Sequence, residues 1–310
     1  MAEPGTALVD GDLTLRAVDG DGGHGDGGDP DPTGELGDHA FSVEWQGEQV
    51  GRVEVIDDGS GDADLIWAVV REYREVGIVE RALRLAVAWT FDALEVHRIE
   101  ARVPDADRSG VRAALRAGMR KEGVARGALA GPGERVDTMV LARLRDDAEP
   151  DSRDGFIALL NSSLPTKRAI AQGVLRDPAG RVLLCELTYK AEWDLPGGVV
   201  DPSESPAECV VREVREELSI DVEVRALLAV NWLPPWRGWS DATVFVFDLG
   251  IADEELIART TLERREIRSL HFAAEEEWEE RVAPYNQRLL AFLAAHAGPT
   301  AYLEDGLPAL

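Results

Sequence analysis

Apolar and polar residues alternate along much of the first half of the chain. Residues 41–56 read FSVEWQGEQVGRVEVI, with alternation on both sides of a glycine turn, which is typical of a β-hairpin. From Ile78 to Trp89, apolar residues instead recur at spacings of three and four, which predicts an amphipathic helix over 78–94. The same two rules predict the remaining elements of this half: strands over 63–70, 97–103 and 138–144, and a helix over 109–117.

The second half repeats this mixture of periods. Two strand-like runs flank the turn DPAG, and a helix starts at Ser205. Further strands and one long C-terminal helix follow. The expected strands are 169–176, 182–187, 222–232, 243–249 and 269–272, and the expected C-terminal helix is 276–295.

The length of 310 residues exceeds what a single core usually supports, so we expect two domains. Order signals fade in the charged run RDDAEPDSRDG, which separates the two halves. We predict an N-terminal domain over 1–147, a linker over 148–163 and a C-terminal domain over 164–310. Within the first domain, the Gly- and Asp-rich segment 20–37 cannot bury apolar surface and is predicted to be a disordered loop.

Composition narrows the range of functions. No apolar run approaches the roughly 18 residues of a membrane span, and no secretory signal opens the chain, so we expect a cytoplasmic protein without membrane contact. Cys185 and Cys209 lie in apolar stretches and are interpreted as buried free thiols. Asp and Glu outnumber Lys and Arg by 59 to 33, giving a formal charge of −26, which disfavours nucleic acid as a partner. A small phosphorylated ligand remains compatible with this charge, because a cation and local arginines can neutralise it.

One segment of the second half concentrates acidic residues on a helix. Residues 198–220 read GVVDPSESPAECVVREVREELSI, and Ser205 to Glu208 form a capping box with proline at the first helical position. At roughly 100° per residue, Glu213 and Glu217 fall together beside the apolar stripe, and Glu216 lies on the adjoining turn. Such clusters usually form a solvated face, but a solvated face would lie opposite the stripe. Carboxylates that border the stripe favour a hard divalent cation, Mg²⁺ or Mn²⁺.

This segment resembles the Nudix box. The matching positions are Gly198, Glu204, Arg212, Glu213, Val214, Glu216, Glu217 and Ile220, with Ser219 where the family has glycine. The resemblance implies an α/β/α sandwich and metal-dependent cleavage of a diphosphate bond in a nucleotide-type substrate. A left-handed Ser219 would cost roughly 1 kcal/mol without removing any chemistry.

The resemblance also implies roles for individual residues. The Gly197 carbonyl and the carboxylates of Glu213, Glu216 and Glu217 would bind the metal ion. Arg212 would orient a glutamate by ion pairing. The general base is left open between Glu216 and Glu266.

Aromatic residues flank the box in the runs EWDLPGG and NWLPPWRGW. Trp193, Trp232 and Trp236 could stack on a base or sugar, with Arg237 on a phosphate. Equally, these tryptophans could simply pack a Pro-rich loop. The sequence does not separate ADP-ribose, a nucleotide sugar and a nucleoside triphosphate as substrate.

The first domain carries a second resemblance. The run from Arg74 to Val79 reads REVGIV, and HRIEARV, PDADRSG and LRAGMRKEG follow. These runs resemble the GNAT N-acetyltransferases, in particular those that modify protein N-termini, over most of residues 11–145. The resemblance implies a mixed sheet with helices and acetyl-CoA bound by Arg74, Gly77 and Val79 at a helix N-terminus. Val79 replaces a small residue and Ala106 an asparagine, so we expect a catalytically weak or ligand-sensing domain.

The whole chain is thus expected to be α/β (α+β), a GNAT-like domain fused to a Nudix domain whose main activity is hydrolysis of a nucleoside diphosphate linked to another moiety. Two alternatives stay open: an N-acetyltransferase with an accessory Nudix domain, and a non-catalytic nucleotide-sensing regulator. The sequence leaves the oligomeric state open, including a homodimer.

Overall fold

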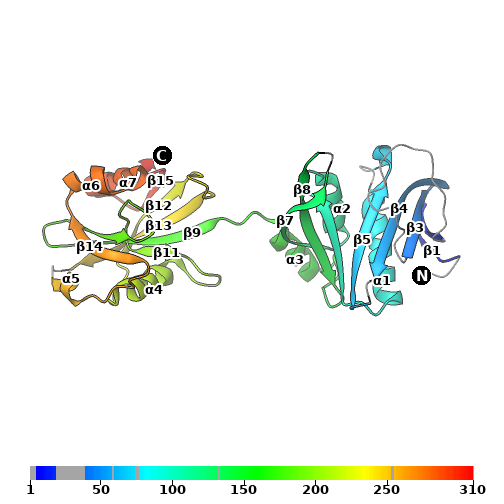
Figure 1. Cartoon of the computed structure of the whole chain (residues 1–310), viewed down its shortest axis with the longest axis horizontal. Helices are drawn as coiled ribbons and strands as arrows, with labels where there is room; N and C mark the ends of the chain where they lie inside the picture. Colours follow the sequence, from blue (N-terminus) through cyan, green and yellow to red (C-terminus); the bar gives the residue numbers. More distant parts are fainter. Residues whose placement is uncertain are drawn as a thin grey trace. The chain divides into compact units, whose positions relative to one another are not determined.

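A computed structural model describes residues 5–18, 39–57, 59–73, 77–131, 133–252 and 255–309. The chain forms two compact units, Met1–Pro165 and Thr166–Leu310. Figure 1 colours the chain continuously along the sequence, from blue at the N-terminus to red at the C-terminus. The loop predicted over 20–37 lies outside the described residues. Within the described part of the chain, no helix has the length and apolar character needed to cross a membrane.

The first unit is built on an eight-stranded mixed sheet in the order β1-β2-β3-β4-β5-β6-β8-β7. Neighbouring strands are antiparallel except β5 and β6, which are parallel. The hairpin expected over 41–56 and the three strands expected after it are confirmed. The strands are β1 (Ala7–Asp10), β2 (Leu13–Val18), β3 (His39–Trp45), β4 (Glu48–Asp57), β5 (Asp62–Val69), β6 (Arg98–Pro104), β7 (Arg120–Ala130) and β8 (Arg135–Leu144).

The parallel junction between β5 and β6 is short. Pairing runs only from Asp62 opposite Arg98 to Asp64 opposite Glu100. Beyond it, β5 continues along β4 and β6 continues along β8. The two strands therefore separate toward the end of β5, from which the chain passes through the short helix η1 (Arg71–Tyr73) to α1 (Ile78–Ala93).

Helices α1 and α2 (Arg108–Arg116) contribute to one apolar core with the sheet of the first unit. The stripe predicted for α1 is confirmed, because Ile78, Ala82, Leu83 and Ala86 are all buried. Helix α2 begins at Asp107, whose side chain accepts a hydrogen bond from the Gly110 N–H at 3.0 Å.

The segment expected to be a linker contains a helix. Helix α3 (Arg153–Ser163) begins after Ser152, whose hydroxyl accepts a hydrogen bond from the Gly155 N–H at 3.1 Å. The charged run expected to be irregular therefore contains the N-cap of this helix, Ser152. The boundary between the two units falls after α3, at Pro165.

The second unit is a sheet covered on both faces by helices. The strand order is β14-β10-β9-β13-β12-β15-β16, with β11 paired to β9. Strands β13 and β9 are parallel, as are β12 and β15. The strands are β9 (Arg168–Arg176), β10 (Val182–Leu187), β11 (Gly197–Val199), β12 (Ala226–Leu233), β13 (Ala242–Ile251), β14 (Ile267–Ala273), β15 (Ala301–Glu304) and β16 (Leu307–Pro308).

Alternate residues of these strands pack into two separate hydrophobic cores, one on each face of the sheet. Val174 belongs to the core that also contains residues of α6 (Glu275–Arg281) and α7 (Pro284–Ala295). Its neighbour Leu175 belongs to the core formed with α4 (Pro206–Leu218). Figure 1 shows α4 on one side of the sheet and α6 and α7 on the other, so the predicted α/β/α sandwich is confirmed. A short helix α5 (Glu255–Arg259) follows β13.

Two predicted boundaries in this unit are wrong. The single helix expected over 276–295 is two helices, because Pro284 forces the preceding Ala283 into an extended conformation (φ −63°, ψ 150°). The strand expected over 222–232 begins only at Ala226. Val222 and Val224 instead pack against the α4-side core.

Candidate active site

Helix α4 carries the acidic residues, and its local sequence explains its bounds. Ser205 accepts a hydrogen bond from the Glu208 N–H at 3.2 Å, and the Glu208 carboxylate accepts one from the Ser205 N–H at 3.0 Å. The predicted capping box is therefore confirmed. At the other end, Ser219 takes the left-handed conformation (φ 56°, ψ 35°) in which the Nudix pattern has glycine. The helix thus ends normally and accepts the strain of a Cβ at this position.

Two adjacent glycines bring the backbone against the helix. Gly197 has a φ of 135°, and a Cβ there would overlap the carbonyl oxygen of Ala171. A Cβ on Gly198 would overlap the carboxylate of Glu213. Glycine therefore lets the turn approach β9 at Gly197 and α4 at Gly198.

Glu217 is the buried carboxylate of the site. It is 7% exposed, and one of its oxygens accepts a 3.3 Å hydrogen bond from the Gly197 N–H. Burial raises its pKa to about 8, and the charges of Glu213, Glu266 and Asp194 add to the effect. A cation at this point would replace the proton that the structure otherwise favours.

Arg212 organises the carboxylates around Glu217. Its guanidinium binds Glu204 in a bidentate manner at 2.7 and 2.9 Å, and this pair holds the pKa of Glu204 at about 2. The same guanidinium lies 2.9 Å from Glu213 and 3.1 Å from Glu216. Burial raises the pKa of Glu213, while Arg212 opposes that rise.

In the described part of the chain, no three His, Cys, Asp or Glu side chains are gathered tightly enough to hold a metal ion. Two of the predicted ligands, Glu213 and Glu216, form ion pairs with Arg212. Glu266, an exposed residue just before β14, is close enough for its charge to raise the pKa of both Glu213 and Glu217. The structure therefore brings Gly197, Glu213, Glu217 and Glu266 into one neighbourhood.

Asp194 also acts on this neighbourhood and was missed in the sequence. It is 8% exposed, and its charge contributes to the raised pKa of Glu217. The only signal was its place in EWDLPGG, three residues before Gly197.

The predicted aromatic residues divide into two groups. Trp193 is buried and stacks on His271 with ring centroids 4.1 Å apart, so it belongs to the core and offers no open face for a base. Trp236 is 43% exposed and lies in a tight turn, paired with Trp239 through two backbone hydrogen bonds. The guanidinium of Arg237 lies 4.1 Å from the Trp236 ring centroid.

Two further polar contacts hold this aromatic turn. Arg237 forms an ion pair with Glu192 at 3.2 Å. Trp232 donates its indole N–H to Asp241 at 3.2 Å. The turn is thus tied to the segment that contains Trp193 and Asp194.

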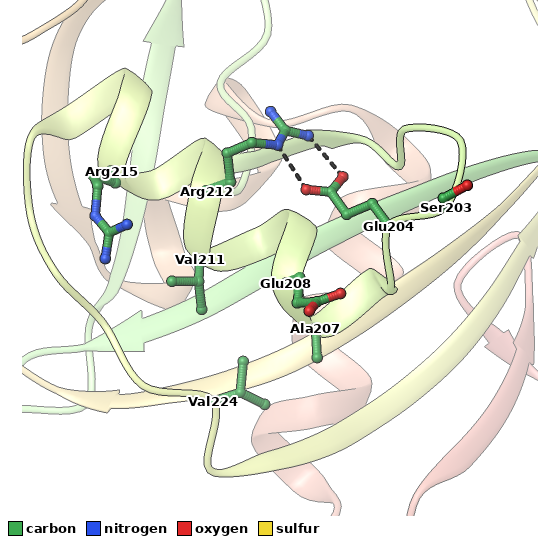
Figure 2. A pocket seen from close by; sticks show the side chains of 8 residues that line it. All are labelled: Ser203, Glu204, Ala207, Glu208, Val211, Arg212, Arg215 and Val224. Carbon is green, nitrogen blue, oxygen red and sulfur yellow. Dashed lines mark hydrogen bonds and ion pairs between the residues drawn. The ribbon is translucent and has the colours of Figure 1, made fainter.

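A shallow hollow of about 550 Å³ lies on another flank of α4 (Figure 2). Figure 2 shows the Arg212–Glu204 pair at its border and Val211 and Val224 pointing toward one another. It contains none of Glu213, Glu216 and Glu217. The hollow therefore shares Arg212 with the carboxylate site but is not the place where those carboxylates meet.

In the first unit, the predicted cofactor residues are only partly described. Arg74 lies outside the described residues. Gly77 has a left-handed conformation (φ 76°, ψ 1°) immediately before α1, and among the described residues no side chain caps the helix. Val79 is 6% exposed and packs into the core, whereas Ala106 is exposed in the turn after β6.

Comparison with known proteins agrees with this division. The model of the NUDIX domain matches residues 166–293, and the model of the acetyltransferase (GNAT) domain matches residues 31–120.

Three curated relatives match parts of the chain. YjhB of Bacillus subtilis, provisionally named an ADP-ribose pyrophosphatase, is 42% identical over 67 residues, which are 21% of this chain and 31% of the relative. An 8-oxo-dGTP diphosphatase of Proteus vulgaris is 35% identical over 66 residues, 20% of this chain and 59% of the relative. YjcK of Bacillus subtilis, named a probable N-acetyltransferase, is 41% identical over 73 residues, 24% of this chain and 40% of the relative. The chain thus spans between about a third and three fifths of these relatives, and it carries an N-terminal GNAT acetyltransferase domain and a C-terminal Nudix domain.

Proposed function

We propose that the C-terminal unit hydrolyses a diphosphate bond in a nucleoside diphosphate linked to another moiety, of the ADP-ribose or nucleotide-sugar type. The observation that carries this proposal is Glu217, a buried carboxylate that accepts a hydrogen bond from the Gly197 N–H. Burial and the charges of Glu213, Glu266 and Asp194 raise its pKa to about 8. Such a group is poised to exchange its proton for a cation.

The donor set suits Mg²⁺ or Mn²⁺, because every candidate ligand is a hard oxygen. Glu213, Glu216 and Glu217 with the Gly197 carbonyl would hold the ion. When bound, such an ion activates water and neutralises charge on the diphosphate. The hydrolysis forms one P–O bond from water and breaks the bridging P–O bond, releasing a nucleoside monophosphate and a phosphorylated remainder.

The protein's own residues would then divide the work. Arg212 orients Glu213 and is itself held by Glu204. Glu216 and Glu266 are the two candidates for the general base, since both are exposed beside the buried carboxylates.

Substrate recognition would use the aromatic turn. The exposed ring of Trp236 can stack on a base or sugar and Arg237 can pair with a phosphate. Trp232 supports that turn, and Trp193 supports the site from the core. The names of two relatives, an ADP-ribose pyrophosphatase and an 8-oxo-dGTP diphosphatase, are consistent with a nucleotide substrate. Free buried cysteines fit a reducing cytoplasm.

The test is a panel of ADP-ribose, nucleotide sugars, NADH, dinucleoside polyphosphates and nucleoside triphosphates, with products identified by phosphorus NMR in ¹⁸O-labelled water. We expect a Mg²⁺-dependent monophosphate product, with ¹⁸O on one phosphorus only. No product from any compound, with either Mg²⁺ or Mn²⁺ present, would refute the proposal.

A second candidate function is acetyl-CoA binding by the N-terminal unit. The observation that favours it is the left-handed Gly77 before a helix that no described side chain caps, beside strands that separate. Backbone N–H groups at a helix N-terminus attract phosphate. Calorimetry with acetyl-CoA, followed by assays of acetyl transfer to peptides and amines, tests it. Transfer activity without diphosphate hydrolysis would support the acetyltransferase alternative, and binding without any turnover would support the regulator.

A further inference from the structure

Asp194 collects four hydrogen-bond donors around one buried carboxylate. Its Oδ1 accepts from Gln172 Nε2 at 2.8 Å, from the Leu195 N–H at 2.9 Å and from Asn286 Nδ2 at 2.5 Å. Its Oδ2 pairs with the Lys190 ammonium. A buried carboxylate is costly unless it is satisfied in this way, so the four donors and the acid form one unit.

The donors come from separate parts of the fold. Gln172 lies on β9, Lys190 in the loop after β10, and Asn286 in the first turn of α7. The backbone of Asp194 also exchanges two hydrogen bonds with Cys185 of β10, at 2.8 and 3.0 Å. Two strands and a helix therefore converge on this side chain.

The same unit leads directly to the glycine turn. Gln172 stands opposite Gly197 in the β9–β11 ladder, and the Gly173 N–H donates to the Pro196 carbonyl at 2.9 Å. Gly197 in turn donates its N–H to Glu217. From Asp194 to Glu217 there is thus a continuous path of hydrogen bonds and strand pairing.

We propose that Asp194 is a positioning residue, which fixes the Gly197 turn and so places Glu217 and the Gly197 carbonyl for metal binding. This inference rests on the proposed function of the site. Asn286 follows Tyr285, whose ring centroid lies 6.3 Å from that of Trp236. The helix residue next to this hydrogen-bond partner of Asp194 therefore also contacts the aromatic turn.

The alternative is that Asp194 only stabilises the fold, and the chain offers a matched control for it. Asp177 is likewise buried, at 2% exposure. It accepts from the Ala179 N–H at 3.0 Å, from the Arg181 N–H at 2.8 Å and from Arg181 Nε at 2.6 Å. Those bonds close the turn between β9 and β10 and do not involve Gly197.

The experiment compares Asp194→Ala, Asp194→Asn and Asp177→Ala in the full chain. Mn²⁺ affinity is measured from the free-ion electron paramagnetic resonance signal, alongside thermal unfolding and kcat and KM. We expect Asp194→Ala to weaken Mn²⁺ binding by about 10- to 100-fold, the usual effect of removing a group that holds metal ligands. Asp177→Ala should lower the unfolding temperature but leave Mn²⁺ affinity unchanged. Asp194→Asn keeps an acceptor for Gln172 and Asn286, so it should recover most of the affinity.

Equal Mn²⁺ affinity in folded Asp194→Ala and Asp177→Ala would overturn the inference. If Asp194→Ala does not fold, Gln172→Ala decides, because it cuts the path at one step; unchanged Mn²⁺ affinity there also overturns it. If Asp194→Ala weakens Mn²⁺ binding but the wild-type protein hydrolyses none of the compounds, the proposed function is refuted and the positioning role of Asp194 stands. Hydrolysis that is indifferent to Asp194 would refute only the positioning role.

Discussion

Helix α4 of the second unit and helix α1 of the first begin in contrasting ways. Ser205 caps α4 with its side chain, whereas Gly77 precedes α1 with a positive φ and, among the described residues, without a side-chain cap. Along α4, the chemistry resides in side chains such as Glu217. At the start of α1, any chemistry would reside in the backbone, since Ile78 and Val79 are both buried in the core.

This contrast shows that a substitution away from a family pattern has different consequences in a site built from side chains and in a site built from backbone. A side-chain site fails when one glutamate changes, because the carboxylate is the ligand. A backbone site depends on conformation, so many residues can occupy it if their side chains point elsewhere. Val79 turns inward, and its bulk is therefore a weaker argument against a phosphate at α1 than the sequence alone indicates.

The largest expected effect is that of Glu217→Gln, which should impair hydrolysis by the second unit and leave the first unit unaffected. This change keeps the size of the side chain and removes the charge that a cation needs. We expect kcat to fall by more than about 100-fold, beyond the usual cost of losing a group behind the ligands, and Mn²⁺ binding to be lost. Acetyl-CoA binding, measured by calorimetry, should not change. Hydrolysis at the wild-type rate would contradict the assignment of Glu217.

Gly198→Ala tests the close approach of the turn. The new methyl group would overlap the Glu213 carboxylate and push it from its position, so we expect a loss of about 10- to 100-fold in kcat/KM. The matched control is Gly123→Ala on β7 of the first unit, where an added Cβ meets nothing within 4 Å. Equal activity in the two variants would show that the turn tolerates movement.

The pH dependence of stability should also separate the two units. The pKa of Glu217 is raised to about 8 in the folded protein, from an ordinary value of 4.5. The folded state therefore holds more protons than the unfolded state between these values, and metal-free stability should fall as pH rises from about 5 to about 8. Mg²⁺ should flatten this slope, and Glu217→Gln should remove its contribution. Thermal unfolding at several pH values, in EDTA and in Mg²⁺, measures both effects. If metal-free stability rises over this pH range and Glu217→Gln abolishes the rise, the raised pKa of Glu217 is contradicted.

Val79→Ala examines the backbone side of the contrast. Removing two buried methyl groups should destabilise the first unit by about 2 kcal/mol. Because the side chain faces the core, acetyl-CoA affinity should not increase. Ala106→Asn, at an exposed position, serves as the control for stability. Much tighter acetyl-CoA binding by Val79→Ala would show that Val79 does obstruct the helix N-terminus.

The smallest effect is expected from Ser219→Gly. Glycine adopts the left-handed conformation without the Cβ penalty, so the change should stabilise the second unit by about 1 kcal/mol and leave kcat unchanged. Ser203→Gly, at another left-handed serine (φ 67°), is the control outside the helix end. Loss of activity in Ser219→Gly would reveal a role that its geometry does not suggest.

The sequence predicts the parts of the site that depend on neighbours along the chain. The capping box and the apolar stripe both lie within helix α4 and its N-cap, and both are found. The hydrogen bond from Asn286 to Asp194 joins residues 92 positions apart, and no local periodicity in the sequence predicts such a contact. The burial of Trp193 could not be predicted for the same reason, because the ring that stacks on it comes from His271 on β14, far away in the sequence.

Other incorrect secondary-structure predictions concern segments in which the sequence carries a local signal for the observed structure. The apolar period over 276–295 continued through Pro284, although proline at that point ends one helix and starts another. In the first unit, β2 alternates from Leu13 to Val18 and could have been predicted as a strand. The charged run before α3 concealed the cap at Ser152.

The two-sided sheet of the second unit has a consequence for how the unit responds to substitutions. On β13, Val246 faces the α7-side core and its neighbour Phe247 faces the α4-side core. A substitution that changes the apolar packing of one layer therefore leaves the apolar side chains of the other layer in place. Asn286 of α7 is an exception, because its hydrogen bond to Asp194 connects the α7 side of the sheet to the chain that leads into the Gly197 turn.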